Sequence, residues 1–287
     1  MPALTRLRTR VLDAASRFDP RTQWYAVGRS LLALATLSIV VATPDSALFP
    51  YLTGQPDGPR CGGLRSLSLW CVGGGSPAAL TIARVATVSV LVAVAAGYRP
   101  RWTCVPHWYA TVSVGVSVYL PNGGDRAAQV ATLLLIPLCL GDHRRWHWTT
   151  PTAPLAPWSG GSAYAAHLAL RLQVAIIYGH AAVAKLSESI WRDGTAVHYA
   201  MQDAYFGAPD GLLRLVESVP GLVFALTWGA VLLEVVIAVT MLGGPRIRIV
   251  ALTCGVALHT AFAAAFGLIS FGLVMIAVLM IANTRSR

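Results

Sequence analysis

Lys185 is a candidate for chemistry because it is the only lysine in the chain, every other residue among the 22 lysines and arginines being arginine. It directly follows an apolar run over 164–184. Burial lowers the pKa of a lysine and can leave a neutral amine that acts as a base, whereas arginine keeps its proton. Lys185 is therefore a candidate catalytic base. The alternative is an interfacial lysine whose ammonium group reaches the lipid headgroups.

Further polar residues repeat along the same apolar run. Arg171, Tyr178 and Lys185 are spaced by seven and fall on one side of a helix, while Gln173 and His180 fall on a nearly opposite side. A helix that is polar on two sides is poorly suited to facing lipid, which predicts a central position in a bundle. Tyr178 and His180 join Lys185 as candidate catalytic residues. The alternative for His180 is a hydrogen-bonded packing role.

Two carboxylates complete the set of candidates. Asp125 belongs to the stretch PNGGDRAAQV over 121–130, which we expect at the outer membrane face, and it is the fourth candidate catalytic residue. Glu234 lies in the apolar run over 221–243, about 14 Å from the inner end, and Arg171 lies about 10 Å from the inner end of its own run. These similar depths predict an ion pair between Arg171 and Glu234. Such a pair would serve packing rather than chemistry.

The cysteines separate into two groups. Cys61 and Cys71 share the segment 44–77, which we expect outside, where an oxidising compartment permits a disulfide bond. Cys104, Cys139 and Cys254 fall at or within the membrane and are interpreted as small apolar residues. The sequence has no CxxC pair, no HExxH motif, and no GxSxG, P-loop or dinucleotide motif. We therefore predict no metal site.

Membrane helices must position these residues. The chain is 55% hydrophobic and 12% charged, with a mean hydropathy of +0.60, whereas a soluble domain carries about a quarter charged residues. We predict an all-α fold, a polytopic transmembrane helical bundle over 27–287 that follows a basic cytoplasmic segment over 1–26. The eight predicted spans are 27–43, 78–97, 106–120, 126–141, 164–184, 221–243, 247–264 and 268–283. Seven or nine spans are the alternatives, because the last two runs are nearly continuous. No cleavage site follows the first run, so we expect a retained helix.

The arginines favour one topology, with both chain ends inside and the protein in the cell membrane. The segments expected inside carry Arg6, Arg8, Arg10, Arg17, Arg21, Arg99, Arg101, Arg144, Arg145, Arg246, Arg248, Arg285 and Arg287. Those expected outside carry Arg60, Arg65, Arg126, Arg192 and Arg214. The net charge of +10 does not indicate nucleic-acid binding, because the arginines form short clusters between apolar runs.

Several stretches together resemble a known family. In order along the chain they are VGRSLLALATLSIVVATPDSALF (27–49), the outer cysteine loop, GYRPRWTCVPHWY (97–109), NGGD (122–125), LLLIPLCLGDHRRWHW (133–148) and YGHAAVAKLSESIWRDGTAV (178–197). This ordered set resembles the sporulation-delaying-protein B family of bacterial membrane proteins. That family falls within the larger HTTM group, which shares a transmembrane domain with vitamin K-dependent gamma-carboxylase. The family often has Asp-Gly-Gly-Asp where this chain begins with Asn122.

The resemblance implies a membrane component required for maturation of a secreted peptide toxin, a bacteriocin. It would act at the extracytoplasmic face with a small SdpA-like partner protein and the toxin precursor. The carboxylase relation implies that Lys185 resembles the catalytic lysine of a reduced-quinone site. Two alternatives follow: a quinol-dependent carboxylase-like enzyme that modifies a peptide or small molecule, and a non-enzymatic docking or export scaffold. A small-solute transporter ranks last, because the chain shows no inverted repeats.

Overall fold

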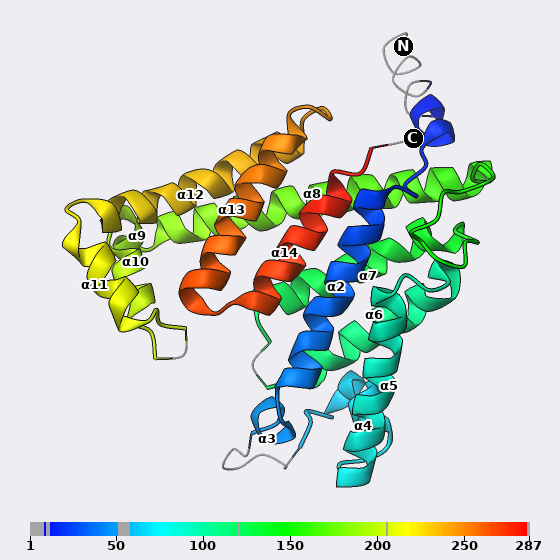
Figure 1. Ribbon diagram of the computed structural model, residues 1–287, viewed down its shortest axis with the longest axis horizontal. Coiled ribbons are helices and arrows are strands. Elements are labelled where there is room, and N and C mark those ends of the chain that lie inside the picture. The colour runs from blue at the N-terminus through cyan, green and yellow to red at the C-terminus, as the bar shows by residue number, and fades with distance from the viewer. Residues whose placement is uncertain (1–8, 10–11, 51–57, 120, 205, 286–287) are drawn as a thin grey trace.

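The computed structural model describes residues 9, 12–50, 58–119, 121–204 and 206–285. Of the predicted inner arginines, Arg6, Arg8, Arg10 and Arg287 lie outside the described residues. The described chain is helical, with no strand. Its eight long helices are α2 (Gln23–Ala42), α5 (Pro77–Ala95), α6 (Pro100–Ser117), α7 (Gly123–Leu140), α8 (Pro157–Ser187), α12 (Leu222–Met241), α13 (Arg248–Phe266) and α14 (Ile269–Ala282) (Figure 1).

Each of these helices overlaps one of the eight predicted apolar runs, and local sequence signals explain several of their ends. The Thr22 hydroxyl accepts the Tyr25 N–H at the start of α2, and Ser76 caps α5 in the same way directly before Pro77. Gly267 adopts a left-handed φ of 67° and divides α13 from α14 within the nearly continuous apolar run. The fold class is therefore confirmed as an all-α helical bundle.

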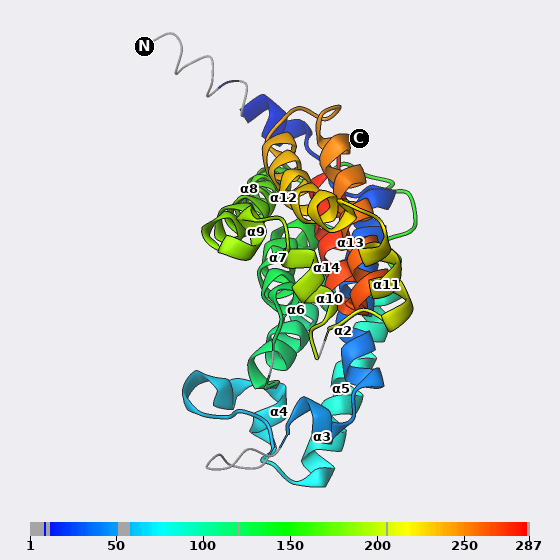
Figure 2. The ribbon, with the colours of Figure 1, turned by 90° about the vertical axis from the view of Figure 1, so that its left-hand side faces the viewer.

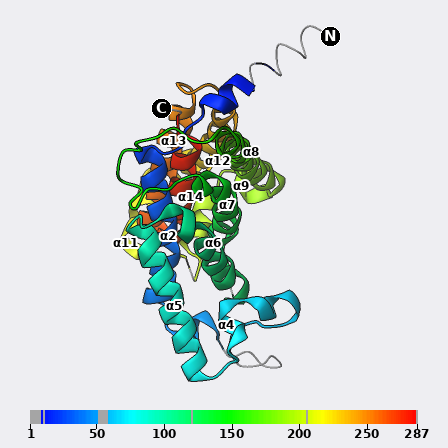
Figure 3. The same ribbon diagram turned by 90° about the vertical axis from the view of Figure 1, so that its right-hand side faces the viewer.

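Short helices occupy the two long connections. α3 (Asp45–Leu48), a 3₁₀ turn over Gly63–Leu67, and α4 (Leu69–Val72) follow α2, while α9 (Ser189–Arg192), α10 (Ala196–Met201) and α11 (Asp210–Ser218) follow α8. The predicted disulfide bond joins Cys61 to Cys71 in the first connection. All three views place α3 and α4 at the end of the molecule opposite the described chain ends (Figures 1, 2 and 3).

Helix α14 lies at the centre of the bundle, where it packs against α2, α7, α8 and α13. Gly28 of α2 lets the two backbones approach closely, because a Cβ there would lie 2.9 Å from the Ala277 carbonyl oxygen. The expectation that α8 is central was wrong. One face of α8 is exposed, including His180 and the apolar side chains of Leu172 and Ile176, because only its other faces pack against α7, α12 and α14.

Five of the helices are long and apolar enough to cross a membrane, namely α2, α5, α8, α12 and α13. The total number of crossings stays a prediction. Segments that the predicted topology places on the same side of the membrane contact one another in the structure. Gln23 bonds to the Trp148 carbonyl and Arg285 to the Pro245 carbonyl, both on the predicted inner side, while the Arg60 N–H bonds to Ser117 on the predicted outer side.

Candidate functional site

The single lysine forms a buried ion pair with a carboxylate of the neighbouring helix. Lys185 lies in the last turn of α8, and its Nζ donates to Glu234 Oε1 of α12 at 2.7 Å. The Glu234 side chain is 6% exposed and that of Lys185 is 21% exposed. The ammonium also lies 5.1 Å from the ring centre of Trp191 in α9, within the range of a cation–π contact. The Lys185 ammonium of α8 is therefore contacted by side chains from α12 and α9.

The second oxygen of Glu234 is the unusual atom of this site. Oε2 is buried and has no hydrogen-bond partner in the described part of the protein. A buried carboxylate oxygen without a partner is costly and normally finds a donor in the protein, water or a ligand. The pair thus presents one charged donor and one free acceptor next to each other. This arrangement can bind a polar group and exchange a proton with it.

Tyr178 and His259 form a second buried pair on the same side of α8. The Tyr178 hydroxyl and His259 Nε2 of α13 lie 2.7 Å apart. The His259 ring contacts Phe262 and Phe271, and its Nδ1 is another buried atom that has no hydrogen-bond partner within the described ranges. Since Tyr178 precedes Lys185 by two helical turns, the two pairs follow one stripe of α8. They bring together Tyr178, Lys185 and Glu234, which the sequence singled out, with His259 of α13.

Arg171 does not pair with Glu234, so that prediction was wrong. Its guanidinium donates to the carbonyls of Met241, Leu242 and Gly243 at 2.9 to 3.3 Å. The reason is that α8 begins at Pro157 rather than at 164, so Arg171 lies level with the C-terminal end of α12. Carbonyls at a helix end lack intrahelical partners and carry partial negative charge, which suits arginine.

The remaining two candidates lie apart from this stripe. His180 is exposed, and no hydrogen bond or ion pair to it occurs among the described residues. Asp125 forms a capping box at the start of α7: its Oδ2 accepts the Asn122 N–H at 2.8 Å, and Asn122 Oδ1 accepts the Asp125 N–H at 3.1 Å. Asn122 supplies the capping oxygen as well as an aspartate would. Asp125 thus has a structural task that accounts for its position.

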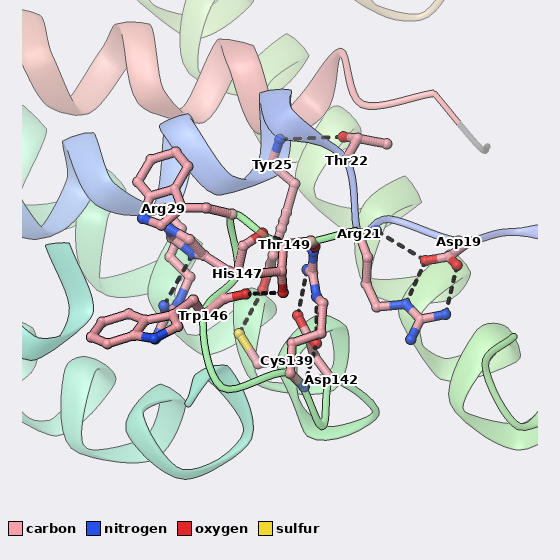
Figure 4. Close-up of polar contacts among 12 residues, drawn as sticks. Asp19, Arg21, Thr22, Tyr25, Arg29, Cys139, Asp142, Trp146, His147 and Thr149 are labelled. Atoms are coloured by element: carbon pink, nitrogen blue, oxygen red, sulfur yellow. Dashed lines mark hydrogen bonds and ion pairs between the residues drawn. The ribbon is translucent and has the colours of Figure 1, made fainter. Parts of the chain in front are cut away.

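A second polar cluster, at the predicted inner end, was missed (Figure 4). Arg29 of α2 is fully buried and donates to Thr103 Oγ1 at 2.6 Å, with His147 Nδ1 3.4 Å away. Burial, reinforced by the charges of Arg29 and Arg144, lowers the pKa of His147 to about 3. His147 is therefore a neutral hydrogen-bonding group at physiological pH. An arginine within the run VGRSLLAL was the signal that could have revealed this cluster.

Within this cluster, Arg144 stabilises the loop over 141–156 through hydrogen bonds to other residues of the same loop. It donates to both carboxylate oxygens of the fully buried Asp142 at 2.8 and 2.6 Å, and to the carbonyls of His147 and Thr149. Tyr25 and Cys139 lie beside the loop, with their oxygen and sulfur 2.7 Å apart. Most of these groups are satisfied by one another, so the cluster serves to fix the loop rather than to react.

Two curated proteins are similar to the chain over most of its length. It is 34% identical over 278 residues to YitO of Bacillus subtilis, which covers 94% of this chain and 89% of YitO. It is 29% identical over 267 residues to the sporulation-delaying protein SdpB of the same organism, covering 92% of this chain and 82% of SdpB. No protein-family model matches the chain. No solved structure matches it.

Proposed function

Because the chain belongs to the protein family that includes YitO and SdpB, we propose that it is a membrane component required for the maturation of a secreted peptide toxin. The observation that carries this proposal is the similarity to SdpB, which extends over 92% of the chain and so includes the helices that hold the Lys185–Glu234 pair. The protein would be a multi-pass protein of the cell membrane with both ends in the cytoplasm. Its partners would be a small SdpA-like protein and the toxin precursor.

The Lys185–Glu234 pair is our candidate for the group that meets the peptide. It lies at the predicted outer end of α8, where a secreted precursor would arrive. The free Oε2 of Glu234 can accept a hydrogen bond from a peptide N–H or amine, and Lys185 can hold or return a proton beside it. The Tyr178–His259 pair, two helical turns from Lys185 along α8, would help to position the Lys185–Glu234 pair.

An enzymatic version of this role is favoured by one specific feature, the use of lysine where the chain elsewhere uses arginine. The carboxylase relation implies a reduced quinone at this lysine. The polar atoms present suit such a group, because Glu234 Oε2 and His259 Nδ1 are buried acceptor or donor atoms that have no partner among the described residues. When bound, a reduced quinone would supply reducing equivalents. The non-enzymatic version uses the same pair only to dock the precursor.

The decisive experiment is mass spectrometry of the secreted peptide from cells that express the precursor, the small partner and one variant of this protein. The variants are wild type, Lys185→Arg, Glu234→Gln and a strain without the protein. Arg214→Gln is the matched control, because Arg214 is an exposed residue on the predicted outer side, in α11. Membrane abundance of each variant is measured by immunoblot, so that loss of processing is separated from loss of protein.

We expect the mature peptide with wild type and Arg214→Gln, and a loss of at least about tenfold with Lys185→Arg and Glu234→Gln, which corresponds to about 1.4 kcal/mol. Arginine keeps the positive charge but cannot release a proton. Full processing by Lys185→Arg together with loss in Glu234→Gln would assign the pair to docking instead. An unchanged peptide in the strain without the protein would rule out the maturation role.

A further inference from the structure

Two adjoining cavities open at the predicted inner end of the bundle, on the side opposite the Lys185 site. The larger has a volume of about 450 Å³ and lies between the start of α8 and the loop over 141–156. The smaller, of about 250 Å³, lies at the start of α6. Both are lined by Arg101, His143 and Arg144, so they form one continuous recess, which we call the inner recess.

The inner recess carries excess positive charge. Two of its arginines are neutralised, since Arg21 pairs with Asp19 at 2.7 Å (Figure 4) and Arg144 pairs with Asp142 at 2.6 Å. The other arginines that line it are Arg99, Arg101 and Arg145. None of these has a carboxylate within ion-pair distance in the described part of the chain, and all are exposed. Converging arginines without counter-ions favour binding of an anion.

The shape and setting of the recess favour an anion that belongs to a lipid. Trp102 and Trp158 line it and are 68% and 71% exposed, as expected of tryptophans at the interface between bilayer and water. Leu140, Leu155 and two prolines, Pro151 and Pro154, line the larger cavity, which gives acyl chains or a glycerol backbone an apolar contact. The amino end of α6 begins at Pro100 beside Arg101, and its dipole adds to the positive potential.

We propose that the inner recess binds the phosphate headgroup of an anionic membrane lipid. Arg99, Arg101 and Arg145 contact the phosphate oxygens, and the tryptophans contact the adjacent lipid. The headgroup thereby supplies the negative charge that the protein lacks at this place. This role is independent of the proposed peptide chemistry, because it uses a different end of the molecule and none of the same residues.

The test measures thermal unfolding of the full-length protein in a neutral maltoside detergent. The probes are dioctanoyl phosphatidylglycerol, dioctanoyl phosphatidylcholine, glycerol 3-phosphate and inorganic phosphate. The test variant is Arg101→Gln with Arg145→Gln, and the matched control is Arg126→Gln with Arg214→Gln, which removes two exposed arginines from the predicted outer side. All four positions are exposed, so we expect each variant to fold. The melting temperature of each variant without lipid checks this.

We expect phosphatidylglycerol to stabilise wild type and the control variant at concentrations about tenfold lower than phosphatidylcholine. Arg101→Gln with Arg145→Gln should raise the required concentration at least about tenfold, because two charge-assisted contacts to the phosphate are removed. Equal effects of the two lipids, or an unchanged response in the test variant, would overturn the proposal. Equal potency of glycerol 3-phosphate or inorganic phosphate would overturn it as well, in favour of a soluble phosphate compound.

Discussion

Buried ion pairs occur at both ends of the bundle, and they differ in how completely their atoms are satisfied. At the inner end, both oxygens of Asp142 accept from Arg144, which also donates to two carbonyls. At the predicted outer end, Glu234 uses one oxygen for Lys185, and its other oxygen is buried with no partner in the part of the chain that the structure describes. A fully satisfied pair stabilises one loop conformation, whereas a free buried acceptor is available to a ligand. This difference is our reason for assigning chemistry to the outer pair alone.

His147 is expected to make the inner end sensitive to acid. Its pKa is lowered by burial from 6.5 to about 3 in the folded protein. The unfolded chain therefore binds one more proton between these two values. The free energy of unfolding is greatest above the unfolded pKa and decreases as the pH falls, by at most about 1.4 kcal/mol per pH unit. We predict that the melting temperature falls between about pH 7 and pH 5, and that His147→Gln reduces this fall.

The control for this prediction is His143→Gln, which changes an exposed histidine of the same loop. That variant should keep the acid sensitivity of wild type. If His147→Gln and wild type lost the same number of degrees over this pH range, another group would be responsible, and the argument from burial of His147 would fail.

At the scale of elements, the contact between α2 and α14 depends on a glycine. A Cβ at Gly28 would lie 2.5 Å from Ile281 Cγ1 and 2.9 Å from the Ala277 carbonyl oxygen, and the latter is backbone that cannot rotate away. We predict that Gly28→Ala lowers the stability of the protein by about 1–3 kcal/mol, because the helices must separate. The measurement is thermal unfolding in detergent micelles.

Gly229 of α12 is the matched control, because a Cβ there meets no atom within 4 Å. Alanine is a better helix former than glycine by about 1 kcal/mol, so Gly229→Ala should leave stability unchanged or raise it. A Gly28→Ala protein as stable as wild type would show that α2 and α14 can move apart without cost.

The helices could be predicted from the sequence, whereas the partners of their polar residues could not. Apolar runs of roughly membrane-spanning length gave the approximate extent of all eight long helices. Pairing depends on how far one helix extends past its neighbour, and the run over 164–184 did not reveal that α8 continues back to Pro157. The sequence therefore predicted an ion pair between Arg171 and Glu234, whereas Glu234 forms its ion pair with Lys185. Similarly, the loop that buries Arg29 brings together residues that are far apart in the sequence.

At the scale of the whole molecule, the two proposals assign different tasks to the two ends. The end with the inner recess carries exposed tryptophans and three arginines that have no ion-pair partner among the described residues. The other end carries the Cys61–Cys71 disulfide bond, which suits an oxidising compartment. Both observations agree with the orientation predicted from the arginines. In that orientation, the Lys185–Glu234 pair would lie on the side where the proposed secreted peptide arrives.

This orientation can be tested with single cysteines and a membrane-impermeant maleimide. We predict that Arg214→Cys reacts in intact cells, and that Arg145→Cys and Arg285→Cys react only after lysis. All three positions are exposed. Wild type gives the background, because Cys61 and Cys71 are bonded, Cys104 and Cys139 are buried, and Cys254 is half-buried.

Arg285→Cys also tests the shortest of the long helices. Helix α14 has 14 residues, and a helix of that length spans about 21 Å, less than the roughly 30 Å core of a bilayer. Its end is nevertheless tied to the predicted inner connection by the bond from Arg285 to the Pro245 carbonyl. The central helix is surrounded by protein and so does not need to match the bilayer thickness. Reaction of Arg285→Cys in intact cells would show that α13 and α14 do not both cross, and would refute the eight-span topology.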